Sequence, residues 1–144
     1  MMFKEFGGAN EKLINEYEDL IQMKLPKDYK KFLLKTNGGS FENAPHLFKI
    51  NGISEEIGLD VLFGFQHARS LNLESWFKEY QYELMENKII IGNTMGAGLI
   101  LLVWQDGLKG IFLWDHAIVL EESTEEDCVY KIADDFKSFL DLLV

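Results

Sequence analysis

The glycines between residues 92 and 98 are the first feature that could carry chemistry, because glycine-rich loops can present backbone N–H groups to phosphate. A phosphate-binding P-loop ends in Gly-Lys-Ser/Thr and opens a helix, whereas an apolar, strand-like run at 99–104 follows here. A dinucleotide-binding fingerprint would need a third glycine at position 101, which Leu101 occupies. We therefore predict a sharp connection between two strands that binds no cofactor. A small-ligand carrier built on residues 96–98 and a tryptophan has little support in the sequence.

The histidines and the single cysteine would bind a metal only if they were spaced as metal ligands are. His46, His67, His116 and Cys128 are scattered and show no paired ligand spacing. Asp115 directly precedes His116, but no Gly-x-Ser-x-Gly nucleophile motif exists to complete a catalytic set. An aspartate at a strand end is typical of a turn in which the carboxylate bonds nearby backbone. We expect no metal, no cofactor and no catalytic residue, and hence a protein that is not an enzyme.

A run of acids after residue 120 is the strongest candidate for a binding surface. Most runs of like charge are solvated loops, and this run is open to that interpretation. Alternatively, its carboxylates bind the basic cleft with which a nuclease grips phosphates, and thereby exclude nucleic acid. The predicted partner-binding residues are Glu121, Glu122, Glu125, Glu126 and Asp127.

The net charge of −10 is the most informative bulk property. It argues against a partner that is nucleic acid or an anionic membrane, since both would repel the protein. It permits steering towards a basic partner, and it is equally typical of a protein whose charge serves only solubility. The 144 residues suffice for one domain, predicted to span 1–144. A lone cysteine, no evident signal peptide and no membrane-length apolar run predict a cytoplasmic protein.

Helices are predicted near both ends of the chain and once in between. Asn10 is suited to cap a helix whose apolar residues recur at helical spacing through residue 21. Pro26, expected at the first helical position, begins a second helix that Asn37 and the two following glycines end. Asn72 is suited to cap a third helix, and the last helix is expected to begin near residues 133–134.

Short apolar runs between these helices predict strands. They lie at residues 46–50, 61–63, 89–91, 99–104, 111–114 and 118–120. Residues 54–60 are expected to form a helical turn or a loop, and Asp106 and Gly107 a turn between strands. Because the later strands follow too closely for parallel crossover connections, the sheet is predicted to be antiparallel. The expected fold class is therefore α+β, a single domain with an antiparallel sheet flanked by N-terminal helices and a C-terminal helix.

The three tryptophans allow two interpretations. Trp76 falls on the apolar face of its predicted helix and is expected in the core. Trp104 and Trp114 fall on strands expected to pair, which would let both pack on one face of the sheet. Burial is the expectation, and the alternative is that one of them lines a groove, since tryptophan is enriched at binding hot spots.

Five segments together resemble the SMI1/KNR4 family, part of the SUKH superfamily. The resemblance covers roughly residues 10 to 144 and rests on motifs in the family's order. These motifs are Leu25-Pro26-Lys27-Asp28-Tyr29 continuing to Asn37-Gly38-Gly39, then Leu62-Phe63-Gly64, then Ile91-Gly92-Asn93 with Gly96-Ala97-Gly98, then Phe112-Leu113-Trp114-Asp115-His116, and finally the segment from Ile132 to Leu140.

The resemblance implies a non-catalytic binding protein. Bacterial members are typically encoded beside polymorphic toxins, often nucleases, so the expected function is an immunity protein that neutralises a cognate toxin by direct stoichiometric binding. The alternative is a regulatory or scaffold module of the kind found in fungal regulators of cell-wall synthesis. The family has no shared catalytic residues, and Thr94 and Met95 interrupt its glycine loop here. Its recurrent positions are expected to determine the fold; they are Pro26, Asp28, Tyr29, Gly38, Gly39, Gly92 and Asp115.

Overall fold

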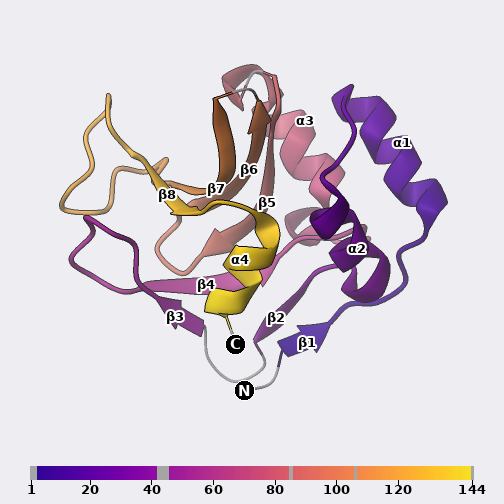
Figure 1. Ribbon diagram of the computed structural model, residues 1–144, viewed down its shortest axis with the longest axis horizontal. Coiled ribbons are helices and arrows are strands. Elements are labelled where there is room, and N and C mark those ends of the chain that lie inside the picture. The colour runs from indigo at the N-terminus through magenta and orange to yellow at the C-terminus, as the bar shows by residue number, and fades with distance from the viewer. Residues whose placement is uncertain (1–2, 42–45, 85, 106, 144) are drawn as a thin grey trace.

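An antiparallel sheet organises the computed structural model of the chain (Figure 1). The structure describes residues 3–41, 46–84, 86–105 and 107–143. Within these residues the sheet has eight strands, which are β1 (Phe3–Glu5), β2 (Gly39–Phe41), β3 (His46–Phe48), β4 (Ile57–Leu62), β5 (Lys88–Thr94), β6 (Leu99–Gln105), β7 (Leu108–Trp114) and β8 (Val129–Ala133). The same residues form the helices α1 (Glu11–Ile21), α2 (Lys27–Thr36), α3 (Leu73–Leu84) and α4 (Phe136–Leu142), with a single 3-10 turn, η1 (Arg69–Leu71).

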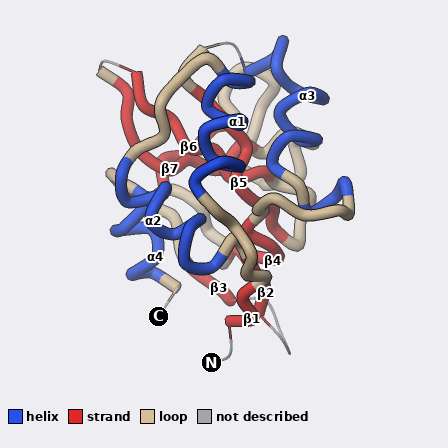
Figure 2. The backbone as a smooth tube through the Cα atoms, turned by 90° about the vertical axis from the view of Figure 1, so that its right-hand side faces the viewer, coloured by secondary structure: helices blue, strands red, loops and turns tan. Residues whose placement is uncertain are grey.

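The strands are arranged in the order β1-β2-β4-β5-β6-β7-β8, and β3 also pairs with β4. Every pairing is antiparallel, as the short spacing of the strands predicted. α2 packs against both α1 and α4, whereas α3 packs on β5 (Figure 2). The predicted α+β class with an antiparallel sheet and helices from both ends of the chain is confirmed. Its extent over residues 1–144 stays a prediction.

Two helices begin where the sequence predicted, and a third begins one residue later. The Asn10 side chain accepts a hydrogen bond from the backbone N–H of Leu13, which caps α1. The Asn72 side chain accepts from the N–H of Glu74 at 2.8 Å and caps α3 in the same way. Pro26 is the N-cap of α2 and not its first helical residue, because its ψ of 146° is extended. Helical geometry therefore starts at Lys27, one residue later than predicted.

The last helix starts later than predicted. Asp135 has extended backbone and accepts a hydrogen bond from the N–H of Ser138, so it is the N-cap and α4 begins at Phe136. Residues 132–133 belong instead to β8, which pairs with β7 and was not predicted. The short strands β1 and β2 were also not predicted. Residues 57–60, expected as a loop or helical turn, form most of β4.

The β6–β7 hairpin is longer than its predicted strands. Its register is continuous, pairing Leu99 with Trp114 and Gln105 with Leu108. Gly107 has the positive φ of 81° that a tight turn needs, and its predicted partner Asp106 lies outside the described residues. The predicted strand at 118–120 does not form, and these residues are a loop between β7 and β8.

The core lies between the sheet and its helices. Apolar side chains of β5, β6 and β7 are buried in it, and the aromatic rings of α2 and α4 pack against each other. The ring centroid of Phe136 is 4.9 Å from those of both Tyr29 and Phe32, in edge-to-face geometry. None of the described helices combines the length and apolar character that crossing a bilayer requires.

Candidate protein-binding surface

The loop between β7 and β8 starts from a buried carboxylate. Asp115 is 2% exposed, and its carboxylate accepts hydrogen bonds from the backbone N–H groups of Val119 and Leu120 at 3.1 and 2.8 Å. Burial acts to raise the pKa of Asp115, but hydrogen bonds from Ser123, Leu120 and Val119 outweigh it and leave the pKa below its usual value. The prediction that this aspartate bonds nearby backbone in a turn is confirmed.

The acidic run that follows is folded back on itself. The backbone N–H of Thr124 donates to the carbonyl of Asp127 at 3.0 Å, and the N–H of Asp127 donates back to Thr124 at both its carbonyl and its hydroxyl. The hydroxyls of Ser123 and Tyr130 lie 2.8 Å apart and tie the loop to β8. The carboxylates of this loop are therefore held on an ordered backbone, which lowers the entropy lost when a partner binds.

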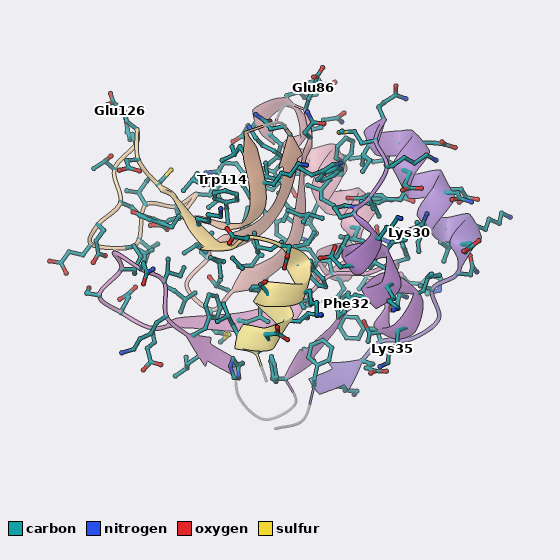
Figure 3. All side chains as sticks on the ribbon, viewed as in Figure 1. Lys30, Phe32, Lys35, Glu86, Trp114 and Glu126 are labelled. Carbon is teal, nitrogen blue, oxygen red and sulfur yellow. The ribbon has the colours of Figure 1, made fainter. Side chains whose placement is uncertain are left out.

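The predicted binding acids divide into two groups. Glu121, Glu125, Glu126 and Asp127 are exposed, and Glu126 lies at the outer tip of the loop (Figure 3). Glu122 instead accepts a hydrogen bond from the backbone N–H of Ser54 at 2.9 Å, which lowers its pKa and joins this loop to the β3–β4 connection. Four of the five acids are thus presented to solvent, and the fifth has a structural contact.

A hollow of about 270 Å³ lies beside this loop. We call it the acidic hollow; its lining includes Leu47, Glu55, Glu56, Met95, Asp115, Val119 and Leu120. The side chains of Leu47, Met95 and Val119 are 53%, 60% and 58% exposed although they are apolar. They come from β3, the β5–β6 turn and the β7–β8 loop, which the fold brings together.

This arrangement has the composition of a protein interface. Interfaces have an apolar centre and a polar rim, and methionine adapts its shape to a partner's surface. Here the exposed apolar side chains line the hollow together with Glu55 and Glu56, and the acidic run directly follows Leu120, the last residue of the β7–β8 loop in this lining. The acidic hollow therefore suits a partner surface that carries apolar groups among lysines and arginines.

The glycine turn connects β5 to β6 and positions Met95. β5 continues to Thr94, so that only residues 95–98 form the connection, and the predicted strand–strand connection is confirmed. The N–H of Thr94 donates to the carbonyl of Gly98, and the N–H of Gly98 donates to the Thr94 hydroxyl at 3.0 Å. The N–H of Met95 donates to Gly58. These donors are already used within the protein, and the closed turn holds the Met95 side chain outward.

The other candidate chemical groups lie apart from each other. His116 is 3.4 Å from the Glu83 carboxylate and against the ring of Trp114, while the Nε2 of His46 contacts the carbonyl of Leu142. Cys128 is half-buried. Among the residues that the structure describes, no group of three or more histidine, cysteine or acidic side chains is placed to hold a metal ion.

The tryptophans are less buried than predicted. Trp76 is half-buried and stacks between Phe63 and Tyr80, so that it covers the core without entering it. Trp114 pairs with Leu99, five residues before Trp104 on β6, so the two tryptophans point to opposite faces of the hairpin and not to one face. Trp104 lines a second hollow of about 440 Å³ with Met23 and Phe77, in agreement with the groove alternative.

Comparison with known families decides the membership of this chain. The model of the SMI1 / KNR4 family (SUKH-1) matches residues 8–142. The chain belongs to the SMI1/KNR4 family. A comparison with curated proteins finds no match. The predicted resemblance is thus confirmed, and with it the coarser functional statement that the chain has an immunity-like or interaction-module role based on protein–protein contacts. The family is known as a non-catalytic binding domain.

The SMI1/KNR4 motif residues lie at junctions of the fold. The Asp28 carboxylate accepts from the N–H of Tyr29 and also from that of Lys137, which joins α2 to the start of α4. Tyr29 is 1% exposed, and Pro26 precedes α2. The role of these positions in determining the fold stays a prediction.

The motif glycines lie where backbones approach closely. Gly38 has a φ of 84°, and a Cβ there would be 2.5 Å from the carbonyl oxygen of Leu62. A Cβ at Gly92 would be 2.6 Å from the carbonyl oxygen of Val61. Gly39 opens β2 directly after this junction. Glycine lets β2 and β5 pack against β4 without steric conflict.

Several residues of the acidic hollow were not found from the sequence. Glu55 and Glu56 lie in a segment with weak patterning, and Val119 belonged to an apolar run interpreted as a strand. Met95 was noted only as a departure from the family's glycine loop. An apolar residue inside a tight turn was the available signal, because a turn on the surface cannot bury it.

Proposed function

We propose that this SMI1/KNR4 protein is a cytoplasmic bacterial immunity protein that neutralises a cognate toxin by stoichiometric binding through the acidic hollow. The observation that carries the proposal is the ordered acidic loop beside three exposed apolar side chains, in a family of binding domains. A nuclease that holds phosphate with lysine and arginine is the partner chemistry that fits best. Occupying its cleft requires no catalytic group.

The mechanism is occlusion assisted by charge. The protein's net charge of −10 attracts a basic partner over distances of about a Debye length, 8–10 Å at moderate salt. The acids of residues 121–127 then orient the encounter, while Leu47, Met95 and Val119 supply the apolar contact that slows dissociation. Binding excludes nucleic acid from the cleft because both occupants present negative charge to the same cations.

The test is binding and growth rescue with the toxin domain encoded beside this gene. The purified proteins are titrated by calorimetry, and the toxin is expressed in cells with and without this chain. The informative variant neutralises four acids, as Glu121→Gln, Glu125→Gln, Glu126→Gln and Asp127→Asn. The matched control removes the same charge elsewhere, as Glu16→Gln, Asp19→Asn, Glu79→Gln and Glu86→Gln, at residues that are all exposed.

One-to-one binding with rescue, and a slower association at low salt for the loop variant than for the control, is the expected result. Electrostatic steering of this kind changes association rates by a factor of about 10 or more. Equal rates for both variants would remove the loop from the interface. Absence of binding and of rescue would contradict the immunity proposal and favour the regulatory or scaffold module of the cell-wall type.

A further inference from the structure

A second surface, with the opposite charge, lies between α2, α4 and the β1–β2 edge of the sheet. It is a groove of about 860 Å³, which we call the lysine groove. Lys27, Lys31 and Lys35 follow one another along α2, and Lys137 stands on α4 across from them. All four are exposed, and within the part of the chain that the structure describes none of them lies within 4 Å of a carboxylate.

Within the described residues the groove lysines lack ion pairs although the chain is rich in acids. Acids outnumber lysine and arginine by 24 to 14, so carboxylates are abundant over the surface. Lys30, one residue from Lys31, does lie 3.9 Å from Glu18. The lysines of the groove therefore form no ion pair with a described acid of the protein, and their charges are available to a ligand.

The floor of the lysine groove is apolar. Phe3 and Phe41 are in edge-to-face contact with ring centroids 5.3 Å apart, and Phe32 lies 6.4 Å from Phe3 (Figure 3 labels Phe32 and Lys35). Leu140 and Leu143 close the floor on the side of α4. A groove of this volume is within the range of about 300–1,000 Å³ that ligand sites occupy.

Two carboxylates also line the lysine groove and offset part of its positive charge. Both oxygens of Asp28 already accept backbone hydrogen bonds, from Tyr29 and from Lys137. Glu5 is exposed on the edge strand β1. Four lysines against two carboxylates leave an excess of positive charge over an apolar floor, in a protein that is otherwise strongly negative.

The spacing of the lysines selects the class of ligand. Positions 27, 31 and 35 are one helical step of four residues apart, so successive side chains are separated by about 6 Å and the row spans about 12 Å. A ligand with one anionic head and an apolar tail would satisfy one lysine and leave the others unpaired. A helical peptide with acids at every fourth residue repeats at the same 6 Å and presents apolar residues on the adjoining stripe.

We propose that the lysine groove binds an acidic amphipathic peptide segment of a partner protein, with its carboxylates along the α2 lysines and its apolar stripe on the phenylalanine floor. The segment binds as a helix lies in a hydrophobic groove, and charge sets its orientation. This surface is separate from the acidic hollow and does not depend on the proposed immunity function. The protein then has two binding surfaces that select partners of opposite charge.

The test uses a synthetic probe and the full chain. The probe is a fluorescein-labelled peptide of about 14 residues, roughly four helical turns, with glutamate at every fourth position and leucine three residues after each. Binding is followed by fluorescence anisotropy, and its position is mapped by backbone amide chemical shifts. Saturable binding with shifts at Lys31, Phe32 and Leu140 is expected, weakening as salt is raised.

Two triple variants distinguish the contribution of the groove lysines to probe binding from the effect of the protein's net charge. Lys27→Gln, Lys31→Gln and Lys35→Gln together are expected to weaken probe binding about 10-fold or more, at about 3-fold for each exposed ion pair. The matched control, Lys12→Gln, Lys78→Gln and Lys109→Gln, removes the same charge from exposed residues outside the groove and should change binding less than 2-fold. Thermal melting verifies that both triple variants remain folded.

Four results would overturn the proposal. The first is the absence of saturable binding, and the second is equal weakening by both triple variants. The third is equally tight binding of dodecanoate, which carries one carboxylate and would indicate a small amphiphile. The fourth is self-association of the chain that the groove variant abolishes, which would assign the groove to a second copy.

Discussion

The acidic hollow and the lysine groove are built by different means although both combine apolar contact with a charged margin. The hollow is made of three connections, and the buried carboxylate of Asp115 fixes the position of Val119 within it. The groove is made of helices α2 and α4 and a sheet edge, so its lysines are spaced by helical geometry itself. A loop surface depends on individual hydrogen bonds, whereas a helix surface depends on the core beneath it. The two should therefore respond to different substitutions.

The largest effect is expected from Phe32→Ala, which acts on the groove. Phe32 is 8% exposed and packs against Phe3, Tyr29 and Phe136, so truncation leaves a cavity that costs about 3 kcal/mol of unfolding free energy. Urea denaturation measures this loss. The control Leu34→Ala removes a partly exposed side chain from the same helix and should cost less than about 1 kcal/mol. A small loss for Phe32→Ala would show that the floor is not part of the core.

The next effect is expected from Asp115→Ala, which acts on the hollow. Two backbone N–H groups lose their acceptor, at a cost of about 2–3 kcal/mol. Hydrogen exchange should accelerate at Val119 and Leu120 and through the acidic loop, while amides of α2 keep their protection. Asp134→Ala is the control, because its ion pair with Lys131 is on the surface and is worth about 1 kcal/mol or less. Faster exchange in α2 as well would contradict the independence of the two surfaces.

A smaller loss of unfolding free energy is expected when the pH is lowered. The pKa values of Asp115 and Glu122 are lowered in the folded protein, so the stabilisation from their ionised forms is complete above the usual carboxyl pKa of about 4. As the pH falls further, the unfolded chain binds these protons first and the stabilisation is lost. Unfolding free energy measured from pH 6 to pH 3 should therefore decrease, and less steeply in Asp115→Ala than in the wild type. Parallel curves would mean that Asp115 does not contribute.

The smallest effect on stability is expected from Met95→Ala. Met95 is 60% exposed, so the unfolding free energy should change by less than about 0.5 kcal/mol. Toxin affinity should fall about 5-fold, because an interfacial apolar contact of about 1 kcal/mol is lost. Binding of the acidic probe peptide at the lysine groove should not change. Unchanged toxin affinity would remove the turn from the binding surface.

The sequence predicted the elements whose signals are local. Asn10 and Asn72 are cap residues, and α1 and α3 begin directly after them. The residue types of Asn37 and the two glycines after it also predicted the end of α2, and Asn37 has the left-handed φ of 54° that such a cap needs. Three short strands, β1, β2 and β8, were missed because they show no clear alternation of apolar and polar residues.

Two wrong predictions have identifiable physical causes. Residues 118–120 form no strand because the Asp115 carboxylate takes the N–H groups of Val119 and Leu120, which a strand would need for its ladder. Residue 132 matched the apolar stripe of the last helix by spacing alone, although Asp135 caps the helix three residues later. In both cases a backbone hydrogen bond to an aspartate sets a boundary that the apolar pattern had misplaced.

The candidate surface was predicted only in part for a related reason. The acidic run is contiguous, so it could be found by composition. Its apolar neighbours Leu47 and Met95 are distant from it in sequence and come close to Val119 only through the successive pairing of the strands from β3 to β7. The lysine groove has no comparable signal in the sequence, because the floor beside the α2 lysines is assembled largely from three other elements.

The bond between Asp28 and the backbone of Lys137 joins residues that are 109 positions apart. Contacts across so long a separation form late in folding, because the closure entropy of the intervening chain has to be offset by structure already in place. α4 is also a short helix, attached through a few aromatic side chains. Since α4 supplies one wall of the lysine groove, a brief release of this helix would dismantle the groove while the sheet stayed folded.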